Sequence, residues 1–79
     1  MRTAEKKAQD YTAMGHSVDL INDIVAGNRD AEMGVEDRQG TVDRNVEHLE
    51  LMVAKDDWGD EDMTAVNASI TAGNGYTAS

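Results

Sequence analysis

Two histidines and one acidic run are the parts of this sequence whose side chains could bind a metal ion. His16 lies one helical turn before Asp19, so both side chains would project from one face of a helix. Zinc sites in proteins use three or four protein ligands, and no further residue has the spacing to complete such a set. His48 stands beside Glu47 and close to Glu50, which is typical of a surface histidine with acidic neighbours. We therefore expect no metal site at either histidine.

The acidic run over residues 56–62 has the composition of a calcium loop but not its spacing. An EF-hand loop needs a glycine at its sixth position and a glutamate at its twelfth. Counted from Asp56, these positions hold Glu61 and Asn67 instead. We interpret the run as a helix cap that also adds to solubility.

Nucleophilic and phosphate chemistry have no sequence support either. The chain has no cysteine, which excludes disulfides, thiolate metal sites and cysteine nucleophiles. Its serines are not surrounded by a nucleophile-elbow sequence. The Gly-Asn-Gly segment at residues 73–75 lacks the lysine and the following helix of a phosphate-binding loop. We expect no catalytic residue, no cofactor and no metal ligand, and hence a protein that is not an enzyme.

Composition narrows the class of protein further. The 79-residue chain has 7 Lys and Arg against 16 Asp and Glu, a formal net charge of −9. Direct binding of nucleic acid needs clustered basic side chains, so this balance argues against it. A membrane span needs about 20 apolar residues, and no such run is present. The basic first residues are not followed by the apolar segment of a signal peptide.

Apolar side chains recur at helical spacing in three stretches, and no alternating strand pattern competes with them. The first stretch repeats at intervals of three and four residues, which predicts a helix over about residues 4–26. Thr3 is its expected N-cap and Gly27 its expected end. The second stretch predicts a helix over about residues 35–56, with Gln39 as a polar interruption of its stripe. Because glycine within a helix is unfavourable, the helix could begin before Gly40 or only at Thr41.

A third, shorter helix is predicted over about residues 60–72. Gly59 would be its N-cap and Gly73 its stop. Its first turn would then hold three carboxylates, which the positive end of the helix dipole stabilises. Trp58 and Met63 would have the spacing of a hydrophobic staple across the N-cap.

The predicted fold class is all-α, a helical hairpin with a short third helix, in a single domain over residues 1–72 and a polar tail over 73–79. Leu, Ile and Val number only 13 of the 79 residues, which leaves little margin against the entropy of ordering the chain. We therefore expect the apolar stripes to form the core and, in part, a surface for self-association or docking. Their residues are Tyr11, Met14, Val18, Ile21, Val25, Val42, Val46, Leu49, Val53, Trp58, Met63, Val66 and Ile70.

One pattern in the second half of the chain carries a resemblance. It consists of Arg44-Asn45-Val46, His48-Leu49-Glu50 and Lys55, then Trp58 before Glu61-Asp62, and it ends in Ala72-Gly73. Over residues 41–76, slightly under half of the chain, the sequence resembles short acidic proteins encoded by tailed bacteriophages. The resemblance implies a phage setting, in which small accessory proteins often attach to the capsid or tail. It implies no particular activity and no functional residue.

The sequence thus predicts a non-enzymatic structural protein. We expect a multi-copy virion accessory or decoration subunit that binds a larger capsid or tail protein through its apolar helix faces. It would form an oligomer or join a symmetric assembly, in the virion and, during assembly, in the host cytoplasm, without contacting nucleic acid or membrane.

The alternative is an early phage protein that mimics DNA and so inhibits a host nucleic-acid-binding protein. Its candidate acidic face consists of Asp37, Glu47, Glu50, Asp56, Asp57, Asp60, Glu61 and Asp62. Four basic residues, Arg29, Arg38, Arg44 and Lys55, are expected to interrupt this surface.

Overall fold

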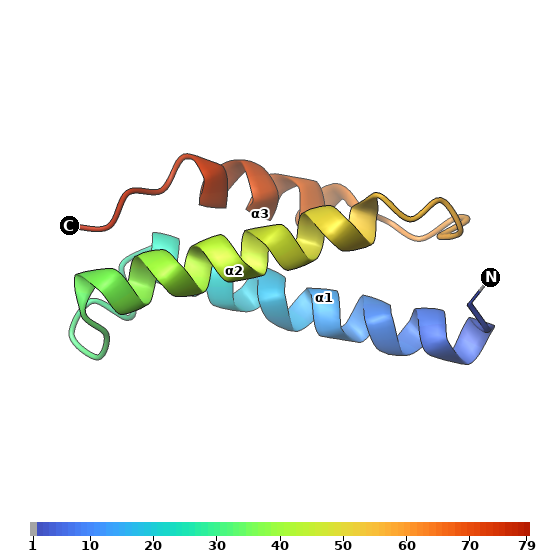
Figure 1. Cartoon of the computed structure of the whole chain (residues 1–79), viewed down its shortest axis with the longest axis horizontal. Helices are drawn as coiled ribbons and strands as arrows, with labels where there is room; N and C mark the ends of the chain where they lie inside the picture. The colour runs from blue at the N-terminus through green and yellow to red at the C-terminus, as the bar shows by residue number, and fades with distance from the viewer. Residues whose placement is uncertain (1) are drawn as a thin grey trace.

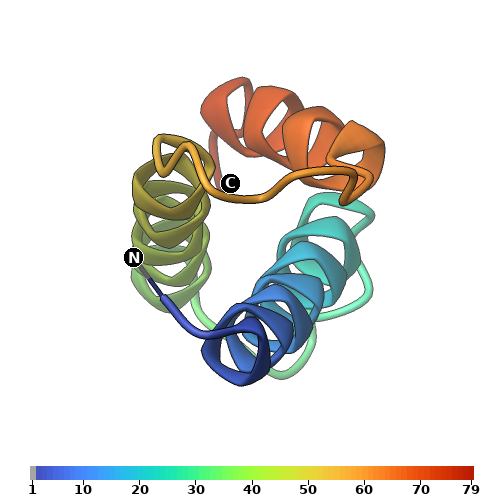
Figure 2. The ribbon, with the colours of Figure 1, turned by 90° about the vertical axis from the view of Figure 1, so that its right-hand side faces the viewer.

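The computed structural model describes residues 2–79 and contains three helices, α1 (Ala4–Val25), α2 (Val35–Val53) and α3 (Thr64–Asn74). They form an elongated bundle of 40 × 19 × 15 Å in which α1 and α2 make a long hairpin and α3 lies along it (Figure 1). Each helix contacts both others around a shared interior (Figure 2). The predicted all-α class, a hairpin with a short third helix, is confirmed, and residues 2–79 contain no strand.

The apolar stripes of the three helices meet in one core. Eight of the thirteen residues predicted from the stripes are buried: Met14, Val18, Ile21, Val42, Val46, Leu49, Trp58 and Val66. The other five are half-buried and pack against this core: Tyr11, Val25, Val53, Met63 and Ile70. Ile24 is also buried. The stripes are therefore covered by one another within a single chain.

Both ends of α1 follow from local sequence. The Thr3 side chain accepts a hydrogen bond from the Lys6 amide at 3.0 Å, which caps the first turn as predicted. At the other end Gly27 has φ +88°, a conformation that favours glycine. The Gly27 amide donates to the Ile24 carbonyl and the Asn28 amide to the Asp23 carbonyl. This pair of bonds is a Schellman motif, which satisfies the last carbonyls of the helix.

The second helix ends at Val53, three residues before the predicted 56. The reason is Trp58, whose indole N–H donates to the Met52 carbonyl at 2.8 Å. The Lys55 amide donates to the same carbonyl. Because the buried indole folds back onto the end of α2, the chain after Ala54 leaves the helix.

The predicted start of the third helix at residue 60 is wrong, because α3 begins at Thr64. Gly59 has φ +66° and lies in the loop, so it does not cap a helix. The carboxylate of Asp62 instead accepts the Thr64 amide at 2.9 Å and so satisfies one free donor of the first turn. Asp60 and Glu61 are exposed loop residues, and Trp58 is pinned to α2 rather than stapled to Met63 across an N-cap.

Gly73 is not a helix stop either. The helix continues to Asn74, and Gly73 is buried where α3 approaches α2. A Cβ atom placed on Gly73 would lie 2.3 Å from Val46 Cγ2. The absence of a side chain therefore sets how closely the two helices pack.

Candidate functional site

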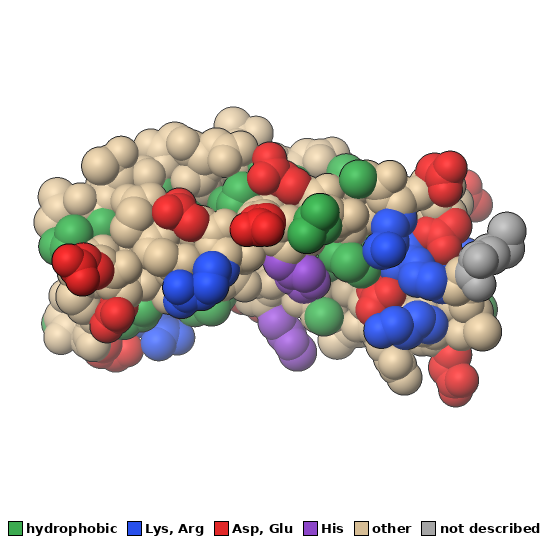
Figure 3. Space-filling view, in the orientation of Figure 1, with side chains coloured by type: hydrophobic (Ala, Val, Ile, Leu, Met, Phe, Trp, Pro, Cys, Tyr) green, Lys and Arg blue, Asp and Glu red, His purple; other side chains and the backbone are tan. Residues whose placement is uncertain are grey.

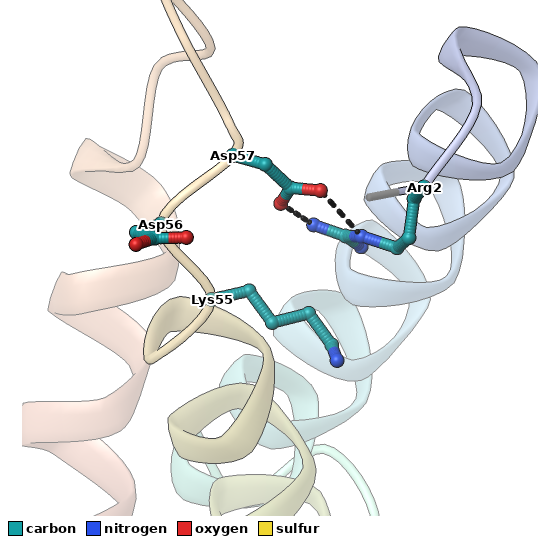
Figure 4. A pocket seen from close by; sticks show the side chains of 4 residues that line it. All are labelled: Arg2, Lys55, Asp56 and Asp57. Carbon is teal, nitrogen blue, oxygen red and sulfur yellow. Dashed lines mark hydrogen bonds and ion pairs between the residues drawn. The ribbon is translucent and has the colours of Figure 1, made fainter.

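An open hollow of about 590 Å³ lies at the end of the bundle where the chain starts, lined by Arg2, Lys55, Asp56 and Asp57. Figure 4 shows Arg2 reaching from the start of α1 to Asp57 in the α2–α3 loop, with Asp56 pointing away. The Arg2 guanidinium donates to both carboxylate oxygens of Asp57 and, at 2.7 Å, to Asp10. It also lies 4.3 Å from the Trp58 ring centroid, a cation–π contact. These contacts fasten the start of the chain to the loop.

The same contacts perturb the ionisation of two carboxylates. The hydrogen bonds from Arg2 lower the pKa of Asp57 to about 2. Hydrogen bonds from Lys6 and then Arg2 lower the pKa of Asp10. Both shifts favour the ionised carboxylates, which is what closed ion pairs require. Arg2 and Asp57, which both line the hollow, therefore neutralise each other as an ion pair.

Asp57→Asn is expected to lower the melting temperature at neutral pH, because Arg2 loses its charged partner. The folded pKa of Asp57 lies below the unfolded value of about 3.9, so its stabilising effect is complete above about pH 4 and is lost as the pH falls toward 2. The difference in melting temperature between wild type and variant should therefore shrink over that interval. Circular-dichroism melts across this pH range measure it. Asp60→Asn, in an exposed part of the same loop, is the control, and an equal effect of both substitutions would contradict the assignment.

Ser17 and His48 have the spacing of a nucleophile and its base. The Ser17 hydroxyl lies 2.9 Å from His48 Nδ1 and joins α1 to α2. Ser17 is only 6% exposed, however, and projects from the middle of a helix into the helix pair. The sequence suggested that His48 is a surface histidine, but this contact leaves it half-buried. The geometry supports an interhelical bond, since a nucleophile must be reachable by its substrate.

His16 and Asp19 do border one hollow, of about 350 Å³, together with Leu20, Asp23 and Arg29. Asp23 is held by Arg29 at 2.6 Å, and hydrogen bonds from Arg29 and Asn28 lower its pKa. Within residues 2–79, no group of three or more His, Asp or Glu side chains is arranged to hold a metal ion.

The exposed side of α3 differs from the rest of the surface in charge. Residues 63–79 contain no charged side chain, although the whole chain carries −9. We call the exposed small residues of this helix the α3 face. It consists of Thr64, Ala65, Asn67, Ala68, Thr71 and Asn74. In Figure 3 the charged side chains gather over the hairpin and its ends, whereas the α3 side along the top is mostly uncharged.

A groove of about 250 Å³ adjoins the α3 face where α3 meets α1. Gly15 and Ala65 open it because neither has a large side chain, and Val18 and Val66 form part of its lining. The Tyr11 hydroxyl donates to the Asp62 carbonyl at 2.6 Å and so ties the groove wall to the loop before α3. The groove is also lined by Asp19 and Asp62. The α3 face itself is therefore uncharged, and it borders a partly apolar groove with two carboxylates at its edge.

Arg38 is a residue whose role the sequence reasoning missed. Only 6% of it is exposed, so it does not interrupt an acidic surface as expected. Its guanidinium donates to the Met33 carbonyl at 3.0 Å, to the Tyr76 hydroxyl at 3.2 Å and to the Ser79 carbonyl at 2.9 Å. A signal was present, because Arg38 lies four residues before Val42 and therefore on the core-facing side of α2.

Comparisons of the chain with protein-family models, with curated proteins and with solved structures find no match. Among the described residues, no helix combines the length and the apolar character that crossing a membrane requires.

Proposed function

We propose that this chain is a non-enzymatic binding subunit, carried in several copies on a phage particle, that docks on a larger capsid or tail protein. The phage setting rests on the resemblance of residues 41–76. The single observation that carries the binding role is the separation of charge, with a neutral α3 face beside an otherwise acidic surface.

The separation favours docking through α3 for a physical reason. Removing a charged side chain from water costs free energy unless it is paired, so interface centres are depleted in charge. The α3 face has no charge to desolvate, and its small side chains allow a partner to approach closely. The neighbouring groove offers apolar surface beside Val18 and Val66.

Docking through the predicted apolar stripes would be less favourable. Residues such as Met14, Ile21 and Leu49 are fully buried within the chain, so a partner could reach them only after the bundle opened. The acidic remainder of the surface keeps neighbouring copies apart by repulsion and keeps the free subunit soluble.

Ala68→Glu tests the proposal, because it places one charge in the middle of the α3 face. An unpaired charge in an interface costs several kcal/mol, so we expect the amount of subunit on purified particles to fall by more than about tenfold. Ala13→Glu, at an exposed position of α1 that does not line the groove, is the matched control and should bind normally. Quantitative mass spectrometry of particles measures both variants, after circular dichroism has shown that they fold. Absence of the wild-type chain from the particles would refute the proposal.

The DNA-mimic alternative ranks second. It needs an open array of carboxylates, and Asp57 is occupied by Arg2 and, through its main-chain carbonyl, by Lys7. Co-purification of the wild-type chain with a host nucleic-acid-binding protein, in competition with DNA, would reverse this order.

A further inference from the structure

The last four residues lie extended against the first turns of α2, beyond the end of α3. Figure 1 shows this segment leaving α3 and running toward the end of the bundle where α2 begins. Gln39 binds its main chain twice, donating to the Tyr76 carbonyl at 3.3 Å and accepting the Ala78 amide at 2.8 Å. Arg38 donates to the Tyr76 hydroxyl and to the Ser79 carbonyl.

This arrangement has the chemistry of a receptor for an extended peptide. The Gln39 side-chain amide pairs with a carbonyl and an N–H two residues apart, much as a neighbouring strand would. The buried Arg38 keeps one nitrogen on the Met33 carbonyl and uses the other two to bind the tail, and one of these two also pairs with Asp30 at 3.3 Å. The tail supplies two acceptors to this guanidinium and helps to cover it. The hydrogen-bonding groups of the site are therefore complementary to the side chain of Tyr76 and to an extended main chain.

We propose that copies of this chain exchange tails, so that residues 76–79 of a second copy bind Arg38 and Gln39 in place of the chain's own. A second copy supplies the identical tyrosine and main-chain groups, so each hydrogen bond is reproduced. The tail joins α3 through Gly75, a residue with the backbone freedom to redirect it.

Charge selects the second copy's tail over its other surfaces. Two chains of −9 repel each other, yet residues 63–79 have no charged side chain and can approach α2 without adding an Asp or Glu side chain to the contact. The competing internal tail has an effective concentration of about 1 mM, so exchange should become populated near that protein concentration, or where copies are held close together. The inference concerns the chain in solution and holds whether or not the proposed function is correct.

Paramagnetic relaxation in full-length protein tests the exchange. The chain has no cysteine, so a nitroxide on Ser79→Cys labels the tail alone. The nitroxide-labelled variant contains nitrogen at natural abundance and is mixed with ¹⁵N-labelled wild type. The spectrum therefore shows only the wild-type copy. We expect amide peaks of residues 36–43 to lose intensity at about 1 mM protein and to keep it at about 0.05 mM. A nitroxide on the exposed Glu50→Cys is the control for random collisions.

Ala78→Pro in the spin-labelled chain makes the test specific, because proline lacks the N–H group that donates to Gln39. Position 78 lies outside the helices, so the substitution should not disturb them. We expect the intensity loss at residues 36–43 to disappear. Persistence of the loss with Ala78→Pro, or a loss no greater than that from the Glu50 label, would overturn the inference. So would equal peak shifts on adding a hexapeptide of the tail sequence and a scrambled one, since the site would then accept any extended chain.

Discussion

Leu49→Ala should cost about 2–5 kcal/mol of unfolding free energy, the range expected when a fully buried large aliphatic side chain is truncated. Leu49 lies on α2, is fully buried and belongs to the core that all three helices share. Truncation removes apolar contacts and leaves a cavity that the surrounding side chains fill only in part. Urea or thermal unfolding followed by circular dichroism measures the loss.

Leu51→Ala is the matched control, because it is the same substitution on the same helix. Leu51 is 64% exposed, so we expect a change within about 0.5 kcal/mol. Equal losses for the two variants would contradict the placement of the core.

The same melts, repeated over a range of protein concentrations, test the prediction that folding needs a partner. If folding is coupled to self-association, the melting temperature rises with concentration. A compact monomer with a concentration-independent transition would refute that prediction.

Gly73→Ala should destabilise the protein by about 1–3 kcal/mol, although alanine favours helices over glycine. The new methyl group would lie 2.3 Å from Val46 Cγ2 and 3.4 Å from Val42 Cγ1, so α3 would have to move away from α2. For a domain of this size each kcal/mol lowers the melting temperature by about 4–8 °C.

Gly15→Ala provides a control of opposite expected sign. Nothing lies within 4 Å of a Cβ atom at Gly15, so the substitution should stabilise α1 by up to about 1 kcal/mol. A second check is Val46→Ala, which makes room for the methyl group. In the Gly73→Ala background it should cost less than in wild type, which a double-mutant cycle measures. A Gly73→Ala variant as stable as wild type would show that α2 and α3 are not in close contact there.

Features encoded within one or two turns of the chain were predictable. Thr3 and Gly27 mark the ends of α1 by their own chemistry, and apolar spacing marks which face of each helix is buried. The start of α3 was not predictable in this way. Glycine followed by three acids is a good local signal for a helix start, but Trp58 is held by Arg2 and by the end of α2, and that contact keeps the acids in a loop.

The candidate binding sites divide along the same line. The absence of charged side chains over residues 63–79 is visible in the sequence. Once the bounds of α3 are known, the helical repeat shows which of these residues lie on its exposed side. The tail receptor cannot be read in advance, because two of the groups that Arg38 and Gln39 bind there are main-chain carbonyls, which every sequence provides.

The stacking of Arg2 on Trp58 gives the protein an internal optical reporter. Trp58 is the only tryptophan of the chain, and its indole contacts both Arg2, which precedes α1, and the Met52 carbonyl near the end of α2. Its fluorescence therefore reports whether the start of the chain is attached, whereas ellipticity reports the helices. Coincidence of the two signals on heating marks a single cooperative transition, and an earlier change in fluorescence marks local detachment before the bundle melts.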